Sequence, residues 1–114
     1  MEIVLHTETP PLHRDATGAL RIGQSHVLLE LVIHAFEDGA TPEAIAQRYS
    51  TATLADIYAA IAYYLRHQAD VKAYLAFREQ QAQQVRQRIE DRQGDLAHLR
   101  SRLLARQHAA SASK

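Results

Sequence analysis

The chain has 114 residues, no cysteine and a net charge of zero, with 13 basic and 13 acidic side chains. This length suits one compact domain with an appendage and excludes two independent cores. The lack of cysteine excludes disulfides, thiolate catalysis and cysteine-ligated zinc. No apolar run reaches the roughly 20 residues that cross a bilayer, and "MEIVLHTETPPLH" has no signal-peptide pattern, so we expect a cytoplasmic protein without membrane contact.

Charge is distributed unevenly along the chain. Residues 1–67 carry four basic and eight acidic side chains, whereas residues 68–114 carry nine basic and five acidic ones. The first part is therefore acidic, and the second is basic and rich in arginine. This asymmetry indicates two parts with different roles.

A small β-hairpin is the first element that the sequence predicts, in "PLHRDATGALRIG", after an N-terminal extension of residues 1–9. Asp15 favours the opening of a turn, and Gly18 accommodates a positive φ. The two prolines at its start confine the first strand to a sheet edge or a strand start.

Three short helices are predicted next. The first ends at Gly39, where a C-cap favours glycine, and has one apolar stripe: Leu28, Leu31, Val32, Ala35 and Phe36. The second has Thr41 as N-cap and Pro42 at its first position. Thr53 caps the third, whose predicted buried stripe is Leu54, Ile57, Ala60, Ile61, Tyr64 and Leu65. We therefore expect a mainly α fold with a small β-hairpin, in which residues 10–67 form a winged helix-turn-helix-like domain.

The segments "PLHRDATGALRIG" and "AFEDGATPEAIAQRYSTATLADIYAAIAYYLRHQADVKAYL" resemble the prokaryotic family called domain of unknown function 433, over roughly residues 10 to 76. The family pattern is matched at these positions: Gly39, Thr41, Glu43, Ile45, Tyr49, Leu54, Asp56, Ile57, Ala59, Ile61, Tyr63 and Tyr64. The resemblance implies an antitoxin-like winged helix-turn-helix protein, paired with a PIN-like nuclease toxin that its C-terminal tail binds. The family's "G-T-R" turn is replaced here by "GQSH", so a role of that arginine does not carry over.

DNA binding is one function that a helix-turn-helix suggests. The candidate contacts are Arg14, Arg21, Arg48, Thr53 and Tyr58. Only two basic side chains lie between residues 39 and 67, which makes the electrostatic attraction to phosphates weak. The alternative is that the third helix packs two copies together as a homodimer. The candidate dimer interface is Tyr58, Ala62, Tyr63, Val71 and Leu75.

Residues 68–107 predict a helical arm for partner binding or dimerisation. Its seam residues are spaced alternately by four and three: Val71, Leu75, Arg78, Ala82, Val85, Ile89, Arg92, Leu96, Leu99 and Leu103. Arginines within the seam favour a different protein as partner, although a simple dimerisation arm stays open. Gly94 predicts a hinge or a helix cap, and residues 108–114 predict a disordered tail. The candidate partner-binding residues are Val85, Ile89, Leu96, Leu99, Arg100, Arg102, Leu103 and Arg106.

Catalysis has no support in the sequence. The seven histidines show no close metal-ligand spacing, and phosphate loops, nucleophile elbows and paired-carboxylate motifs are lacking. We expect no catalytic residues, no metal and no cofactor. The interpretation is an antitoxin-like protein that neutralises a PIN-like ribonuclease and represses its own operon by binding operator DNA. The alternative is a structural oligomerisation adaptor with no toxin or DNA partner.

Overall fold

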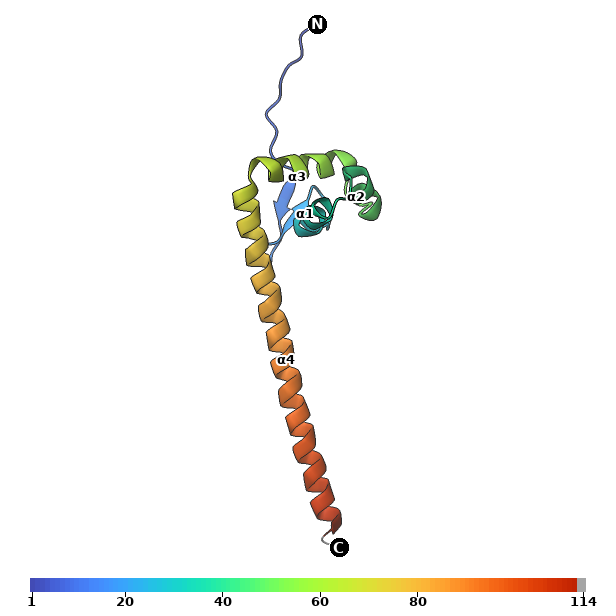
Figure 1. The fold of residues 1–114 in the computed structure, drawn as a ribbon, viewed down its shortest axis with the longest axis vertical. Helices are drawn as coiled ribbons and strands as arrows, with labels where there is room; N and C mark the ends of the chain where they lie inside the picture. The colour runs from blue at the N-terminus through green and yellow to red at the C-terminus, as the bar shows by residue number, and fades with distance from the viewer. Residues whose placement is uncertain (113–114) are drawn as a thin grey trace. The chain divides into compact units, whose positions relative to one another are not determined.

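The structure of the chain is a computed structural model that describes residues 1–112 (Figure 1). Its elements are β1 Leu12–Arg14, β2 Leu20–Ile22, α1 Leu29–Glu37, α2 Pro42–Arg48, α3 Leu54–Arg66 and α4 Gln68–Ala112. The chain divides into two units, Met1–Leu75 and Ala76–Lys114. The predicted fold class is confirmed: a mainly helical unit with one small hairpin precedes a long C-terminal helix.

The hairpin forms where the sequence predicted it, because its turn residues satisfy one another. β1 and β2 pair in antiparallel orientation. Asp15 Oδ1 accepts hydrogen bonds from the backbone N–H groups of Thr17 and Ala19, at 2.8 and 3.0 Å. Gly18 has a φ of 87°, which a residue with a side chain rarely adopts. The turn is thus held by hydrogen bonds among residues 15–19.

Threonine caps begin both helices of the predicted helix-turn-helix. Thr41 Oγ1 accepts a hydrogen bond from the N–H of Ala44 at 3.1 Å, and Pro42 follows it as the first residue of α2. Thr53 Oγ1 accepts one from the N–H of Asp56, also at 3.1 Å, at the start of α3. Each hydroxyl satisfies a backbone donor that has no partner within its helix. Both predicted N-caps are confirmed.

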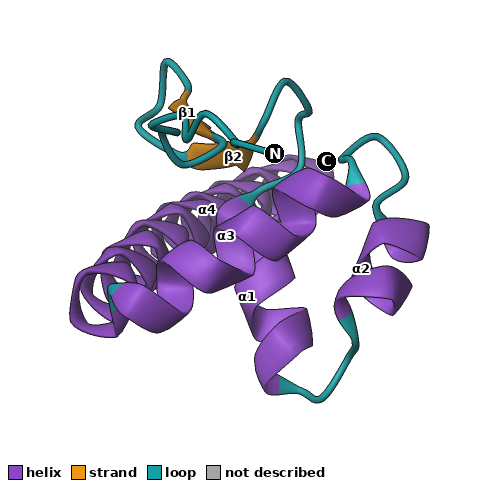
Figure 2. Ribbon diagram, turned by 90° about the horizontal axis from the view of Figure 1, so that it is seen from above, coloured by secondary structure: helices purple, strands orange, loops and turns teal. Residues whose placement is uncertain are grey.

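Helix α3 lies at the centre of the first unit and contacts α1, α2 and β2 (Figure 2). The largest fully buried side chains around it are Ile22, Leu29, Val32, Ile33, Ile45 and Ile57. Tyr64 is also buried and meets the ring of Phe36 edge-on, with 6.5 Å between centroids. Its hydroxyl donates a hydrogen bond to the Glu37 carboxylate, and this bond raises the pKa of Tyr64. The hydroxyl of the buried tyrosine therefore has a hydrogen-bond partner while its ring fills the core.

Three leucines that the sequence placed on buried stripes lie at the surface. Leu31 on α1, and Leu54 and Leu65 on α3, are 40–50 % exposed. The prediction was wrong for them because the buried face of α1 is rotated relative to the predicted stripe, and the buried face of α3 is narrower than its stripe. On α1 the buried residues include Leu29 and Ile33, which the predicted stripe left out.

The first turns of α4 belong to the same core. Val71 is only 4 % exposed, and Leu75 packs against the buried cluster. The hydroxyl of Tyr74 accepts a hydrogen bond from the backbone N–H of Leu20 at 2.7 Å. This bond joins the start of α4 to the hairpin, so the compact unit extends beyond the predicted domain boundary at residue 67.

A close approach joins the end of the hairpin to the start of α3. Gly23 has a φ of 52°, in the left-handed region. A Cβ atom built there would fall inside van der Waals contact with Oδ2 of Asp56. Gly23 is therefore required both by its backbone conformation and by the space that Asp56 occupies.

Helix α4 runs without interruption from Gln68 to Ala112. The hinge predicted at Gly94 is absent from this helix. One exposed glycine costs only about 1 kcal/mol of helix stability, and the many good helix formers of α4 offset that cost. The helix also includes residues 108–112 of the segment predicted to be disordered, three of which are alanines. Residues 113–114 of that segment lie outside the described residues. Among the described helices, none has both the length and the apolar character for crossing a membrane.

Candidate functional site

The two helices of the predicted helix-turn-helix are joined by a hydrogen bond between side chains. The hydroxyl of Tyr58 on α3 donates a hydrogen bond to the carboxylate of Glu43 on α2. This bond lowers the pKa of Glu43 and raises the pKa of Tyr58. Tyr58 was a candidate DNA contact, but its hydroxyl is engaged inside the domain and its partner is an acid. Sequence reasoning missed this pair because the two residues are 15 positions apart on different helices.

The two hairpin arginines proposed as DNA contacts are bonded within the hairpin region. Arg21 Nε lies 2.7 Å from Asp15 Oδ2, and its Nη1 donates to the carbonyl of His26. Arg14 Nη1 donates to the carbonyl of Gly18 at 3.1 Å. Both guanidinium groups therefore have local partners, which a phosphate would have to replace. Of the candidate arginines, Arg48 stands on the exposed side of α2.

The Asp15 network predicts acid sensitivity of the first unit. The Thr17 hydroxyl and then the Arg21 guanidinium hold the pKa of Asp15 well below its usual range. Because the folded pKa is lower than the unfolded value of about 3.9, this group stabilises the fold at higher pH and loses that contribution as pH falls below the unfolded value. We expect Asp15→Asn to lose less stability than the wild type between about pH 6 and about pH 3.

Denaturant unfolding at a series of pH values measures this difference. Thr17→Val keeps the carboxylate but removes one of its donors, so we expect its acid dependence to lie between those of the wild type and Asp15→Asn. Superimposable pH profiles for all three proteins would contradict a stabilising role of the Asp15 network.

The predicted dimer-interface residues do not share one surface. Tyr58 and Ala62 are exposed on α3, whereas Tyr63 is half-buried and stacks on His67 with 4.5 Å between ring centroids. Val71 is buried in the core of its own chain, so the prediction that it meets a second copy was wrong. The seam periodicity of α4 could not distinguish a residue covered by its own chain from one that awaits a partner.

The second unit presents the predicted partner-binding residues in full. Every side chain from residue 83 to residue 107 is exposed. The aliphatic side chains of the stripe are 51–60 % exposed: Val85, Ile89, Leu96, Leu99 and Leu103. Because helix neighbours three and four apart share a face, these side chains lie along one side of α4, where Arg92 interrupts the apolar stripe between Ile89 and Leu96. Arg100, Arg102 and Arg106 are exposed along the same stretch.

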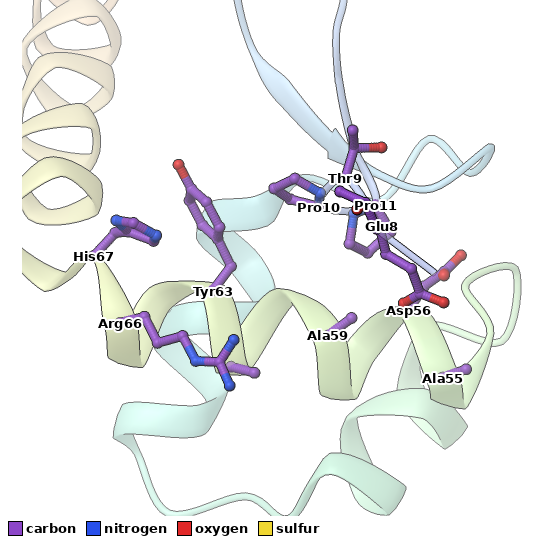
Figure 3. A pocket seen from close by; sticks show the side chains of 12 residues that line it. Glu8, Thr9, Pro10, Pro11, Ala55, Asp56, Ala59, Tyr63, Arg66 and His67 are labelled. Carbon is purple, nitrogen blue, oxygen red and sulfur yellow. The ribbon is translucent and has the colours of Figure 1, made fainter. Parts of the chain in front are cut away.

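A groove that the sequence did not predict runs along α3 (Figure 3). Its volume is about 870 Å³. One wall is the N-terminal segment of residues 7–11, and the other is the side of α3 that carries Ala55, Ala59, Ala62 and Tyr63.

Histidines and carboxylates do not gather into a metal site within the described part of the chain. No group of three or more potential ligands lies close enough there to hold an ion. Nδ1 of His13 donates to the carbonyl of Gly23, and His26 contributes only its carbonyl, to Arg21. These two histidines therefore have separate structural partners.

The hairpin and the three short helices form one compact, mainly helical unit that ends before the exposed part of α4. Residues 16–64 match the model of the family described as "Protein of unknown function (DUF433)", and they form a domain of that family. The family resemblance inferred from the motifs is thereby confirmed over a shorter range than the expected residues 10 to 76. Searches of curated proteins and of solved structures gave no match.

Proposed function

We propose that this chain is an antitoxin-like binding protein, without enzymatic activity of its own, that neutralises a PIN-like ribonuclease through α4. The observation that carries the proposal is the exposed apolar stripe of α4 from Val85 to Leu103. An isolated amphipathic helix is only marginally stable in water, and most of its stability in a protein comes from packing of its apolar face. A long stripe of exposed aliphatic side chains is typical of a helix that docks in the groove of a partner.

The arginines of the arm indicate the chemistry of the partner surface. Ribonucleases of the PIN-like type hold Mg²⁺ with clustered carboxylates. A guanidinium forms two parallel hydrogen bonds with a carboxylate and competes with the cation for it. Arg100, Arg102 and Arg106 are exposed close to the last leucines of the stripe, so docking of those leucines supports an approach of one arginine to the metal site.

An oligomerisation adaptor with no toxin partner is the alternative. In a parallel pair of two identical arms, each seam arginine would lie opposite the same arginine of the other copy. Like charges at a seam destabilise a homodimer. Arg92 stands at such a position, between Ile89 and Leu96. This charge pattern favours a different protein as the partner, and it is the reason for preferring the antitoxin proposal.

Co-expression with a PIN-like nuclease encoded by a neighbouring reading frame tests the proposal. We expect the full chain to co-purify with the nuclease and to abolish its cleavage of RNA. A chain ending at Gln93 keeps the whole first unit but lacks the last leucines and arginines, and we expect it to lose inhibition. Full inhibition by this shortened chain would show that residues 94–107 are not the inhibitory segment.

Operator binding is the second and less supported part of the proposal. It is supported by the arrangement of α2 and α3 and by the exposure of Arg48. It is weakened by the local bonds of Arg14, Arg21 and Tyr58. A gel shift with promoter DNA at low and moderate salt, for the free protein and for its nuclease complex, tests it. If binding occurs, we expect Arg48→Ala to weaken it at all sequences and to reduce the salt slope by about one. No shift in either state would remove the repressor function.

A further inference from the structure

The outer face of α3 is apolar although it is exposed. Its exposed side chains are Leu54, Ala55, Tyr58, Ala59, Ala62, Leu65 and Arg66. At 100° per residue these positions cover an arc of roughly 140°, and Arg66 is its one charged member. A helix that faces water normally places charged and polar residues there. This face, which we call the α3 outer face, is therefore suited to an apolar cover.

A second exposed apolar group lies in the same unit. Ile3, Val4 and Leu5 are 73–89 % exposed, and they follow an exposed Met1. β-branched and aliphatic residues in a row favour an extended segment, in which successive side chains point to opposite faces. We call residues 1–6 the N-terminal arm.

The chain's own arm does not cover the α3 outer face, because Ile3, Val4 and Leu5 are exposed, although the residues that follow the arm border this face. Residues 7–11 already line the groove beside α3, opposite Ala59 and Tyr63 (Figure 3). Pro10 and Pro11 fix their own φ angles and restrict the residue before each to extended conformations. The N–H of Gly23 donates to the carbonyl of Pro11 at 2.6 Å and anchors this segment to the hairpin. A stiff, anchored segment favours an arm that continues outward over one that reverses onto its own helix.

We propose that two copies of the chain exchange their N-terminal arms, so that the arm of each copy lies on the α3 outer face of the other. In a two-fold symmetric dimer the same contact occurs twice, so the arm and the α3 outer face of both copies are covered. Charge is complementary as well, because the arm carries Glu2 and the face carries Arg66 as its one charge. This assembly uses no residue beyond Leu75, so it is independent of the proposed function of α4.

The absence of cysteine makes the exchange directly measurable in the full-length chain. Val4→Cys is introduced into a tagged chain and Ala62→Cys into an untagged one, and the two are mixed, equilibrated and oxidised. Because disulfides form only when Cα atoms lie within about 7 Å, we expect a tagged–untagged disulfide that peptide mass spectrometry assigns to positions 4 and 62. Ala59→Cys covers the neighbouring turn in the same way. The matched control is Gln47→Cys, which is exposed on α2 and should give at least tenfold less product.

The same pair of substitutions in one chain separates exchange from folding back. If the arm lay on its own α3, Val4→Cys with Ala62→Cys would give a disulfide at the mass of one chain, and the mixed chains would give none. That result would overturn the proposal, and so would a lack of cross-linking from position 4 to both position 59 and position 62. Introducing Ala55→Glu into the Ala62→Cys chain adds a charge to the α3 outer face at an exposed position, and we expect it to reduce the tagged–untagged product at least tenfold. An unchanged yield would contradict the apolar contact.

Discussion

Replacing Ile57 by Ala is expected to lower the free energy of unfolding by about 2–5 kcal/mol. Ile57 is fully buried on α3, the helix that contacts α1, α2 and β2. The substitution loses the transfer free energy of the removed carbons and leaves a cavity that the rigid surroundings fill only in part. Small domains have a total stability of about 5–15 kcal/mol, so this single change removes a large fraction of it. Urea unfolding followed by circular dichroism measures the loss.

Leu31→Ala is the matched control for this prediction. It removes the same number of carbons from a helix of the same unit, but Leu31 is exposed on α1. We expect a clearly smaller loss of stability, because exposed apolar atoms gain little from folding. Equal losses for the two variants would mean that the buried cluster around α3 does not dominate the stability of the unit.

Leu96→Asp combined with Leu99→Asp is expected to abolish the neutralisation of the partner nuclease. Both leucines stand on the exposed apolar stripe of α4. If they are central anchors of the interface, each costs about 2 kcal/mol or more, which is roughly 30-fold in Kd. The introduced carboxylates would also repel an acidic metal site. Titration of nuclease activity with the variant, and calorimetry for Kd, measure the effect.

Ala97→Asp combined with Ser101→Asp adds the same charge to the same turns of α4 on a different face. We expect this control to keep inhibition, and both double variants to keep the unfolding curve of the first unit. If the control lost inhibition as completely as the leucine variant, net charge and not the apolar stripe would explain binding.

Local chemistry is the part of the structure that the sequence predicted well. The Asp15 turn, the N-caps at Thr41 and Thr53, and the helix end at Gly39, which has a φ of 97°, all occur as expected. In each case either a side chain accepts a hydrogen bond from a nearby backbone N–H group, or a glycine adopts a positive φ. Such signals do not depend on tertiary contacts, so they can be found in the sequence alone.

Contacts between distant parts of the chain were not predictable in the same way. Leu54 and Ile57 read as one apolar stripe, and only the packing of α3 decides that the first is exposed and the second buried. Val71 fits the seam of α4 as well as Leu96 does, yet one is covered by its own core and the other is not. The Tyr58–Glu43 bond and the groove beside α3 arise from two segments each, and neither segment signals the contact on its own.

The close approach of Gly23 to Asp56 has a consequence for how this domain can diverge. A side chain at position 23 requires both a left-handed backbone and the removal or movement of the Asp56 carboxylate. The effects of Gly23→Ala and Asp56→Ala are therefore expected to be non-additive, because the second change relieves the clash but not the backbone strain of the first. Among relatives, a residue larger than glycine at the first position should be accompanied by a small residue at the second. The order in which positions 23 and 56 are substituted therefore decides which intermediates fold.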